Sequence, residues 1–91
     1  MTMIAAWLSI DENNVVPALR EAAEKLDGAG GEVVLDFVAV RRIDSNALRA
    51  LEELASLAEK NAVKVVLRGI HVDVYKVLKL VKLAPRFTFL S

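Results

Sequence analysis

The residues best suited to chemistry in this chain are Asp44 and Ser45, which stand where an apolar run gives way to a helical pattern. Asp and Ser are strong helix N-cap residues, because their side-chain oxygens accept hydrogen bonds from unpaired N–H groups of the first turn. Leu48, Leu51 and Leu54 recur at the spacing of one helix face, which predicts a helix beginning at Ser45. A hydroxyl at the positive end of a helix dipole suits a phosphate dianion. Ser45 is therefore a candidate for phosphorylation, and the alternative is that the pair only caps the helix.

The chain contains no recognisable catalytic constellation. His71, the single histidine, falls in a predicted loop with only Asp73 nearby, so a solvated position is expected. Ser45 lacks the flanking glycines of a nucleophile elbow. Asp36 and Asp44 flank the end of one predicted strand, but two carboxylates without a further ligand are a weak metal site. We therefore predict a protein that is not an enzyme, with no catalytic residue, metal or cofactor.

Length and composition limit the classes of protein that this chain can represent. Its 91 residues are 55% hydrophobic and 26% charged, which is typical of one small globular domain spanning residues 1–91. Twelve basic and twelve acidic residues give zero formal net charge, which argues against direct nucleic-acid binding. There is no cysteine for a disulfide or a thiolate. No segment resembles a signal peptide or reaches the length of a membrane span, so we expect a cytoplasmic protein without membrane insertion.

The charges are unevenly distributed along the chain. Up to Lys60 there are six Lys and Arg against eleven Asp and Glu, whereas from Asn61 onward there are six against one. Opposite patches would then face different partners. The alternative is that the fold interleaves these segments and the patches vanish.

Strand-like and helical patterns alternate from one end of the chain to the other. Strands are predicted at 3–10, 32–37, 63–68 and 87–90, and helices at 15–26, 45–61 and 72–83. Helices of this length can cross over between parallel strands. The valine-rich run at 32–37 suits a central strand covered on both faces. In such α/β layers, sites tend to lie beyond the carboxyl ends of strands, as Asp44 and Ser45 do.

Two element boundaries have specific signals. Asn13 or Asn14 is expected to cap the first helix, with Pro17 accepted in its first turn. The Gly-rich stretch 27–31 ends that helix. A phosphate-binding loop requires a strand before it and a helix after it, and here the order is reversed.

Three apolar residues are expected outside the core. Trp7 is predicted to pack on the sheet edge. Leu80 and Leu83 fall on or beside the lysine face of the third predicted helix. They either dock a partner or tuck under the C-terminal segment.

These residues, taken together, resemble a STAS domain. The resemblance lies in the run 33–37, the Ile-Asp-Ser at 43–45, the leucine-rich helix, the run 63–67, and the final helix followed by a short strand. It extends from about Val15 to the end of the chain. It implies a single small α/β domain of order β-α-β-α-β-α-β, with a four-stranded mixed sheet and about three helices.

In the anti-sigma factor antagonists of this family, the serine after the aspartate is phosphorylated by a partner that is both kinase and anti-sigma factor. The unmodified antagonist binds that partner and frees the sigma factor, and phosphate abolishes binding. The resemblance therefore implies Ser45 as phospho-acceptor and Asp44 as its acidic neighbour. A dianion beside Asp44 would repel an acidic partner surface. The expected partner-binding residues are Asp44, Ser45, Asn46, Arg42 and Arg49, and the three arginines Arg41, Arg42 and Arg49 are expected on the rim.

Two features depart from the antagonist pattern. The family usually continues with Ser/Thr-Gly, where this chain has Asn46-Ala47. The N-terminal hairpin of the antagonists is also shortened to a single strand.

A second branch of the family shares some of these residues. The runs 66–70 and 74–76 are similar to the STAS subunit of bacterial phospholipid-transport ABC complexes, which binds the ATPase subunit without a phosphate switch. The partner is therefore an anti-sigma factor with serine kinase activity or, in the alternative, a transporter ATPase. In either case we expect a monomer when the protein is free.

Overall fold

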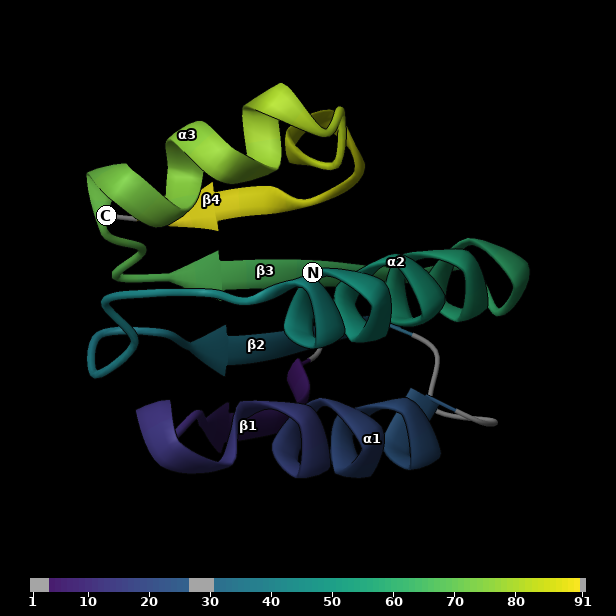
Figure 1. Cartoon of the computed structure of the whole chain (residues 1–91). Coiled ribbons are helices and arrows are strands. Elements are labelled where there is room, and N and C mark those ends of the chain that lie inside the picture. Colours follow the sequence, from purple (N-terminus) through teal and green to yellow (C-terminus); the bar gives the residue numbers. More distant parts are fainter. Residues whose placement is uncertain (1–3, 27–30, 91) are drawn as a thin grey trace.

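Strands and helices alternate along the chain, as predicted (Figure 1). The computed structural model describes residues 4–26 and 31–90, so Met3 and most of the Gly-rich stretch 27–31 lie outside the described residues. The main elements are β1 (Ile4–Ser9), α1 (Val15–Leu26), β2 (Gly31–Asp36), α2 (Ser45–Lys60), β3 (Val63–Arg68), α3 (Val72–Leu80) and β4 (Thr88–Leu90), with short 3-10 helices η1 (Glu12–Asn14) and η2 (Ala84–Arg86).

The four strands form a sheet of order β1-β2-β3-β4 in which every neighbouring pair is parallel. The prediction of a mixed sheet is therefore wrong. Each strand is instead joined to the next by a helical crossover, which returns the chain to the same end of the sheet. The strand order never reverses, so the described sheet has no topological switch point.

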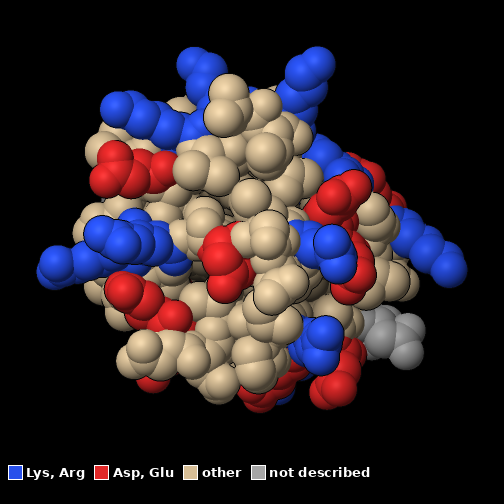
Figure 2. All heavy atoms as spheres, viewed as in Figure 1, with Lys and Arg blue, Asp and Glu red and all other residues tan. Residues whose placement is uncertain are grey.

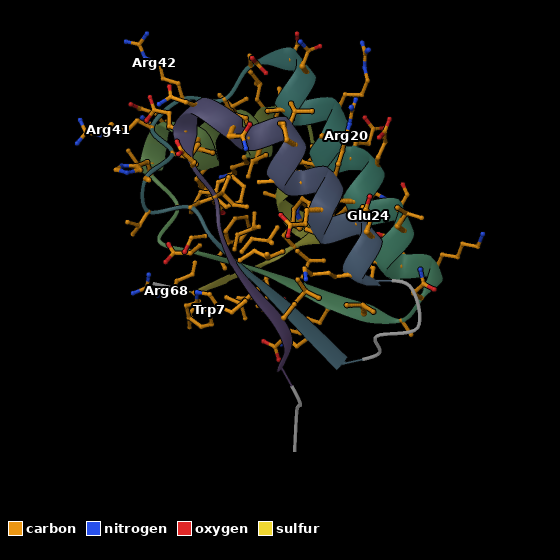
Figure 3. All side chains as sticks on the ribbon, turned by 90° about the horizontal axis from the view of Figure 1, so that it is seen from below. Trp7, Arg20, Glu24, Arg41, Arg42 and Arg68 are labelled. Carbon is orange, nitrogen blue, oxygen red and sulfur yellow. The ribbon has the colours of Figure 1, made fainter. Side chains whose placement is uncertain are left out.

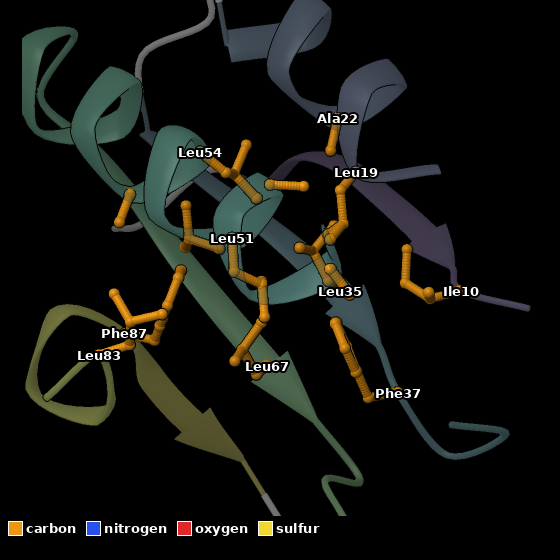
Figure 4. Packing of buried hydrophobic residues seen from close by; sticks show 14 of the residues in the cluster. Ile10, Leu19, Ala22, Leu35, Phe37, Leu51, Leu54, Leu67, Leu83 and Phe87 are labelled. Atoms are coloured by element: carbon orange, nitrogen blue, oxygen red, sulfur yellow. The ribbon is translucent and has the colours of Figure 1, made fainter. Parts of the chain in front are cut away.

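All three helices pack on the same face of this sheet. Right-handed crossovers that always step in one direction keep the helices on one side, and Figure 1 shows α1 and α2 in front of the strands. Their buried residues join those of β2 and β3 in one cluster (Figure 4). Leu19 of α1 and Leu51 and Leu54 of α2 are at most 1% exposed, against Leu35 and Leu67 of the sheet. The predicted apolar face of the second helix is thus confirmed as part of the core.

The opposite face of the sheet carries no helix of the described chain. Val34 and Val66 are only 2% and 3% exposed, yet they do not belong to the cluster under the helices. Trp7, which is the register partner of Val34, is 51% exposed on the edge strand β1. β2 is an inner strand whose residues are buried on both faces, as expected, with Val33 and Leu35 under the helices and Val34 on the opposite face. The crossovers leave this face open because none of them passes behind the sheet.

The residues that lead into the first helix differ from the prediction. Asp11, and not Asn13 or Asn14, is the N-cap, and its side chain accepts a hydrogen bond from the Asn13 N–H at 2.9 Å. This cap starts the 3-10 turn η1, which leads directly into α1 at Val15. Pro17 lies in the first turn of α1, as expected.

The third helix is shorter than predicted. It ends at Leu80, and Lys82 adopts a positive φ of 64° that turns the chain away. Leu83 is therefore buried, at 5% exposure, whereas Leu80 is 82% exposed. No helix in the described ranges is both long and apolar enough to cross a bilayer.

Candidate functional site

The site suggested by the sequence lies at the start of α2, and its cap has the predicted geometry. Asp44 has extended backbone angles, and its Oδ1 accepts a hydrogen bond from the Ala47 N–H at 2.8 Å. Its carbonyl oxygen accepts from the Leu48 N–H at 3.0 Å. Asp44 is thus the N-cap and Ser45 the first helical residue. The assignment of α2 to begin at Ser45 is confirmed.

Ser45 and Asn46 are exposed on the first turn. No residue in the described part of the chain accepts a hydrogen bond from either of their backbone N–H groups. These donors, together with the positive end of the α2 dipole, face solvent beside the Ser45 hydroxyl. The arrangement is able to accept an anionic group without rebuilding the helix.

Side-chain hydrogen bonds hold the segment 37–44 that leads into the site. Asp36 Oδ1 accepts from the Val38 N–H at 3.0 Å. His71 Nε2 lies 3.0 Å from the Val38 carbonyl oxygen, and as a donor it would bind this loop to the start of α3. Glu12 Oε2 accepts from the Arg41 N–H at 3.2 Å and ties the loop to η1. The loop is therefore fixed from β2, η1 and the β3–α3 turn.

Open grooves surround the start of α2. One groove, of about 210 Å³, lies against η1 and is lined by Arg42 and Asp44. A second, of about 320 Å³, separates Ser45 and Arg49 from the turn after α3. A third, of about 360 Å³ on the α1 side, contains Asn46 and again Arg49. The fold thus brings Asp44, Ser45, Asn46, Arg42 and Arg49 to one region. Arg42 and its neighbour Arg41 project outward from the preceding loop (Figure 3).

The structure adds residues to this region that the sequence analysis did not identify. Val81 and Lys82 line the groove opposite Ser45, and Glu12 holds Arg41. Nothing in the local sequence marks them, because helical crossovers bring them beside α2. The positive φ of Lys82 is the feature that turns this segment into the groove.

The acidic N-terminal part and the basic C-terminal part of the sequence form separate surface patches only in part. Lys and Arg side chains project from the upper edge of the molecule, where α3 lies, whereas both signs are mixed over the middle of that face (Figure 2). Arg86 Nη2 lies 2.8 Å from Glu59 Oε1, which joins the basic C-terminal third to α2. Its hydrogen bonds lower the pKa of Glu59 below the usual value and raise the pKa of Arg86. The fold therefore interleaves part of the two charged segments and leaves α3 basic.

The two carboxylates considered for a metal site have other partners. Asp36 Oδ2 lies 3.1 Å from Arg68 Nη1, while Asp44 caps α2. Within residues 4–26 and 31–90, no three His, Cys, Asp or Glu side chains gather as a metal site would require. Shallow open grooves, in contrast to an enclosed apolar pocket, suit a macromolecular partner better than a small ligand.

The fold and this site define a small α/β domain with an exposed serine beside the cap of a helix that is bordered by grooves. The chain belongs to the STAS domain family, whose sequence model matches residues 9–91. The resemblance identified from the sequence is confirmed. No curated protein matches the chain. Among solved structures, it is similar to a Thermotoga maritima protein proposed to be an anti-sigma factor antagonist, with a TM-score of 0.70 and 20% identity, covering 96% of this chain and 74% of that chain.

Proposed function

We propose that this STAS domain is a non-catalytic interaction module, an anti-sigma factor antagonist that binds its partner around the start of α2. Phosphorylation of Ser45 switches this binding off. The observation that carries the proposal is the exposed Ser45 next to the Asp44 cap, with open grooves on both sides of it. The fold shared with the Thermotoga protein supports the same assignment.

A phosphate on Ser45 would act through charge and leave the fold in place. The group adds nearly two negative charges beside Asp44. The N–H groups of Ser45 and Asn46 and the helix dipole accommodate it locally. Arg49 lies one turn further along α2 and lines the same groove as Ser45, so a phosphate would also compete for this cation. A partner that presents acidic groups to Arg42 and Arg49 would then meet repulsion in place of attraction.

The replacement of the usual glycine by alanine is compatible with this switch. Ala47 is 2% exposed and belongs to the core cluster under α2. Its methyl group therefore points into the domain and adds no bulk on the exposed side of Ser45. A kinase that approaches Ser45 would meet Asn46, which is exposed.

The proposal is tested by affinity purification from the native host with wild type, Ser45→Ala and Ser45→Asp, followed by mass spectrometry of the retained proteins. We expect wild type and Ser45→Ala to retain a kinase-like anti-sigma factor that Ser45→Asp loses. Ser56→Asp is the matched control, because it adds the same charge to α2 far from its start, and it should retain the partner. Incubation of the retained complex with ATP should phosphorylate Ser45 of the wild type.

A different result would identify the other branch of the family. A transporter ATPase retained equally by all variants would overturn the phosphate switch and assign the domain to a transport complex. Loss of every partner in both Ser45 variants would show that Ser45 contributes contact area and no switch.

A further inference from the structure

The helix-free face of the sheet is unusual for a sheet whose strands are all parallel. Such sheets occur almost exclusively with both faces covered. Here all three helices lie on one side, and Figure 3 shows Trp7 and Arg68 on the side opposite α1 and α2. This open face is composed of the outward-pointing residues of the four strands: Trp7, Ser9, Glu32, Val34, Asp36, Lys64, Val66, Arg68, Thr88 and Leu90.

The two edges of the open face are apolar and incompletely buried. Trp7 on β1 and Leu90 on β4 are each 51% exposed. The Arg68 guanidinium lies 5.9 Å from the centre of the Trp7 ring, which orders the indole across the face. The centre of the face, at Val34 and Val66, is already shielded from water. A covering partner would therefore remove water mainly from the two edge side chains.

The two central strands carry opposite charges in register. Glu32 of β2 lies level with Lys64 of β3, and Asp36 lies level with Arg68. Asp36 and Arg68 form an ion pair within the chain, but neither Glu32 nor Lys64 forms one with another described residue. The open face thus has an acidic column beside a basic column.

This pattern is complementary to itself, and we propose that a second copy of this chain covers the open face. The symmetry axis of the pair runs along the strand direction, between β2 and β3. Such a rotation places β2 of each copy over β3 of the other while keeping each residue at its level along the strand. Glu32 then faces Lys64 of the second copy, and Val34 faces Val66. Trp7 comes over β4, where Leu90 lies within the reach of an indole.

The charges select this axis over the other face-to-face arrangement. An axis across the strands would place β2 over β2 and reverse the levels. Glu32 would then lie over Asp36, and Lys64 over Arg68, which brings like charges together. Only the axis along the strands pairs acid with base.

The size of the face predicts a reversible dimer. Three strands of six residues and the three-residue β4, about 4.8 Å apart, give a footprint of at most roughly 19 by 20 Å. The two copies together would bury about 800 Å² at most, below the range of stable specific interfaces, so the association is weak and transient. The proposal differs from the expectation of a monomer and is independent of the proposed function. The start of α2 lies on the helix side of the sheet, so the dimer leaves that site free.

The single tryptophan reports directly on this interface. We expect the Trp7 emission of the wild type to shift to shorter wavelength as concentration rises toward the millimolar range. Sedimentation velocity should show conversion from monomer to dimer over the same range. High salt should weaken the dimer, because charge pairs contribute to it. A monomer with unchanged emission at the highest concentration would overturn the proposal.

A charge swap tests the axis. Glu32→Lys and Lys64→Glu should each weaken dimerisation at least tenfold, because like charges then face each other. The double variant Glu32→Lys/Lys64→Glu should recover it. An equimolar mixture of the two single variants should also form a dimer, which no effect within one chain can explain. Glu53→Lys, on the exposed face of α2, is the matched control and should dimerise as the wild type does.

The charge-swap variants and their mixture either support or overturn the proposed dimer. Circular dichroism of the single variants establishes that they are folded before dimerisation is compared. Recovery in the mixture supports the acid-to-base contact between copies. Dimerisation that is unaffected by the single variants, or a mixture that stays monomeric, would overturn this arrangement.

Discussion

Gly69 lies directly against Val38, so that a Cβ atom added to Gly69 would fall 2.5 Å from Cγ2 of Val38. Gly69 also has a positive φ of 68°, which favours glycine. The contact joins the β3–α3 turn to the loop that carries the chain from β2 into α2. The presentation of Asp44 and Ser45 therefore depends on a glycine 24 residues further along the chain.

Gly69→Ala should destabilise the domain by about 2 kcal/mol, through backbone strain and the contact with Val38. The double variant Val38→Ala/Gly69→Ala removes the contact but keeps the strain, and it should recover about half of the loss. Urea denaturation of the wild type, both single variants and the double variant measures this coupling. Additive effects of the two changes would show that Val38 moves aside without cost.

Asp44→Ala should cost about 1 kcal/mol, because the Ala47 N–H loses its acceptor. Asp44→Asn preserves a capping oxygen, so its loss of stability should be only about a few tenths of 1 kcal/mol. Chemical denaturation compares the two variants, and hydrogen exchange at the first turn of α2 locates the effect. Equal losses in both variants would show that the negative charge of Asp44, and not its hydrogen bond, stabilises the helix.

Leu51→Ala should destabilise the domain by roughly 2–5 kcal/mol, because Leu51 is 0% exposed and its removal leaves a cavity between α2 and the sheet. Leu80→Ala is the matched control, since Leu80 is 82% exposed, and it should change stability by less than about 0.5 kcal/mol. Thermal and urea unfolding provide the comparison. A large loss for Leu80→Ala would mean that this side chain is buried in solution.

The pair of Glu59 and Arg86 should make stability depend on pH in the acidic range. Hydrogen bonds from Arg86 lower the pKa of Glu59 in the folded chain, so the unfolded chain binds more protons there. The stabilisation of the fold by the Glu59–Arg86 pair is complete above the ordinary pKa of glutamate. It is lost as the pH falls through the lowered pKa of Glu59. The stability difference between wild type and Glu59→Gln should therefore shrink between about pH 7 and about pH 3. The pair is exposed, so the difference is expected to be small, and a difference independent of pH would exclude this account.

The helices and strands could be predicted because their signals are local. The strand predicted at 63–68 has the same bounds as β3, and the cap at Asp44 correctly indicated the start of α2. The cap of the first helix could not be chosen, because Asp11, Asn13 and Asn14 are all good capping residues. Asp11 caps the 3-10 turn η1 that precedes α1, and nothing in the sequence pattern marked this extra turn.

Strand direction and the surroundings of the site depend on tertiary structure. The mixed sheet was expected from the family resemblance, whereas the helical connections of this chain require parallel neighbours. The clustering of Asp44, Ser45 and Asn46 could be predicted because these residues adjoin one cap, while their role in partner binding stays a proposal. Glu12 and Lys82 could not be predicted, since each reaches the site only through the packing of another element against α2.

The unbroken strand order also bears on how the chain folds. Each strand pairs only with its neighbours in sequence, as in the pairs Ala6 with Val33 and Val66 with Thr88. No pairing has to close a loop longer than one strand-helix-strand unit, which keeps the entropic cost of each step low. During synthesis on the ribosome, β1, α1 and β2 can therefore assemble before α3 has emerged. The last strand then adds to an existing edge, so that growth of the sheet follows the direction of translation.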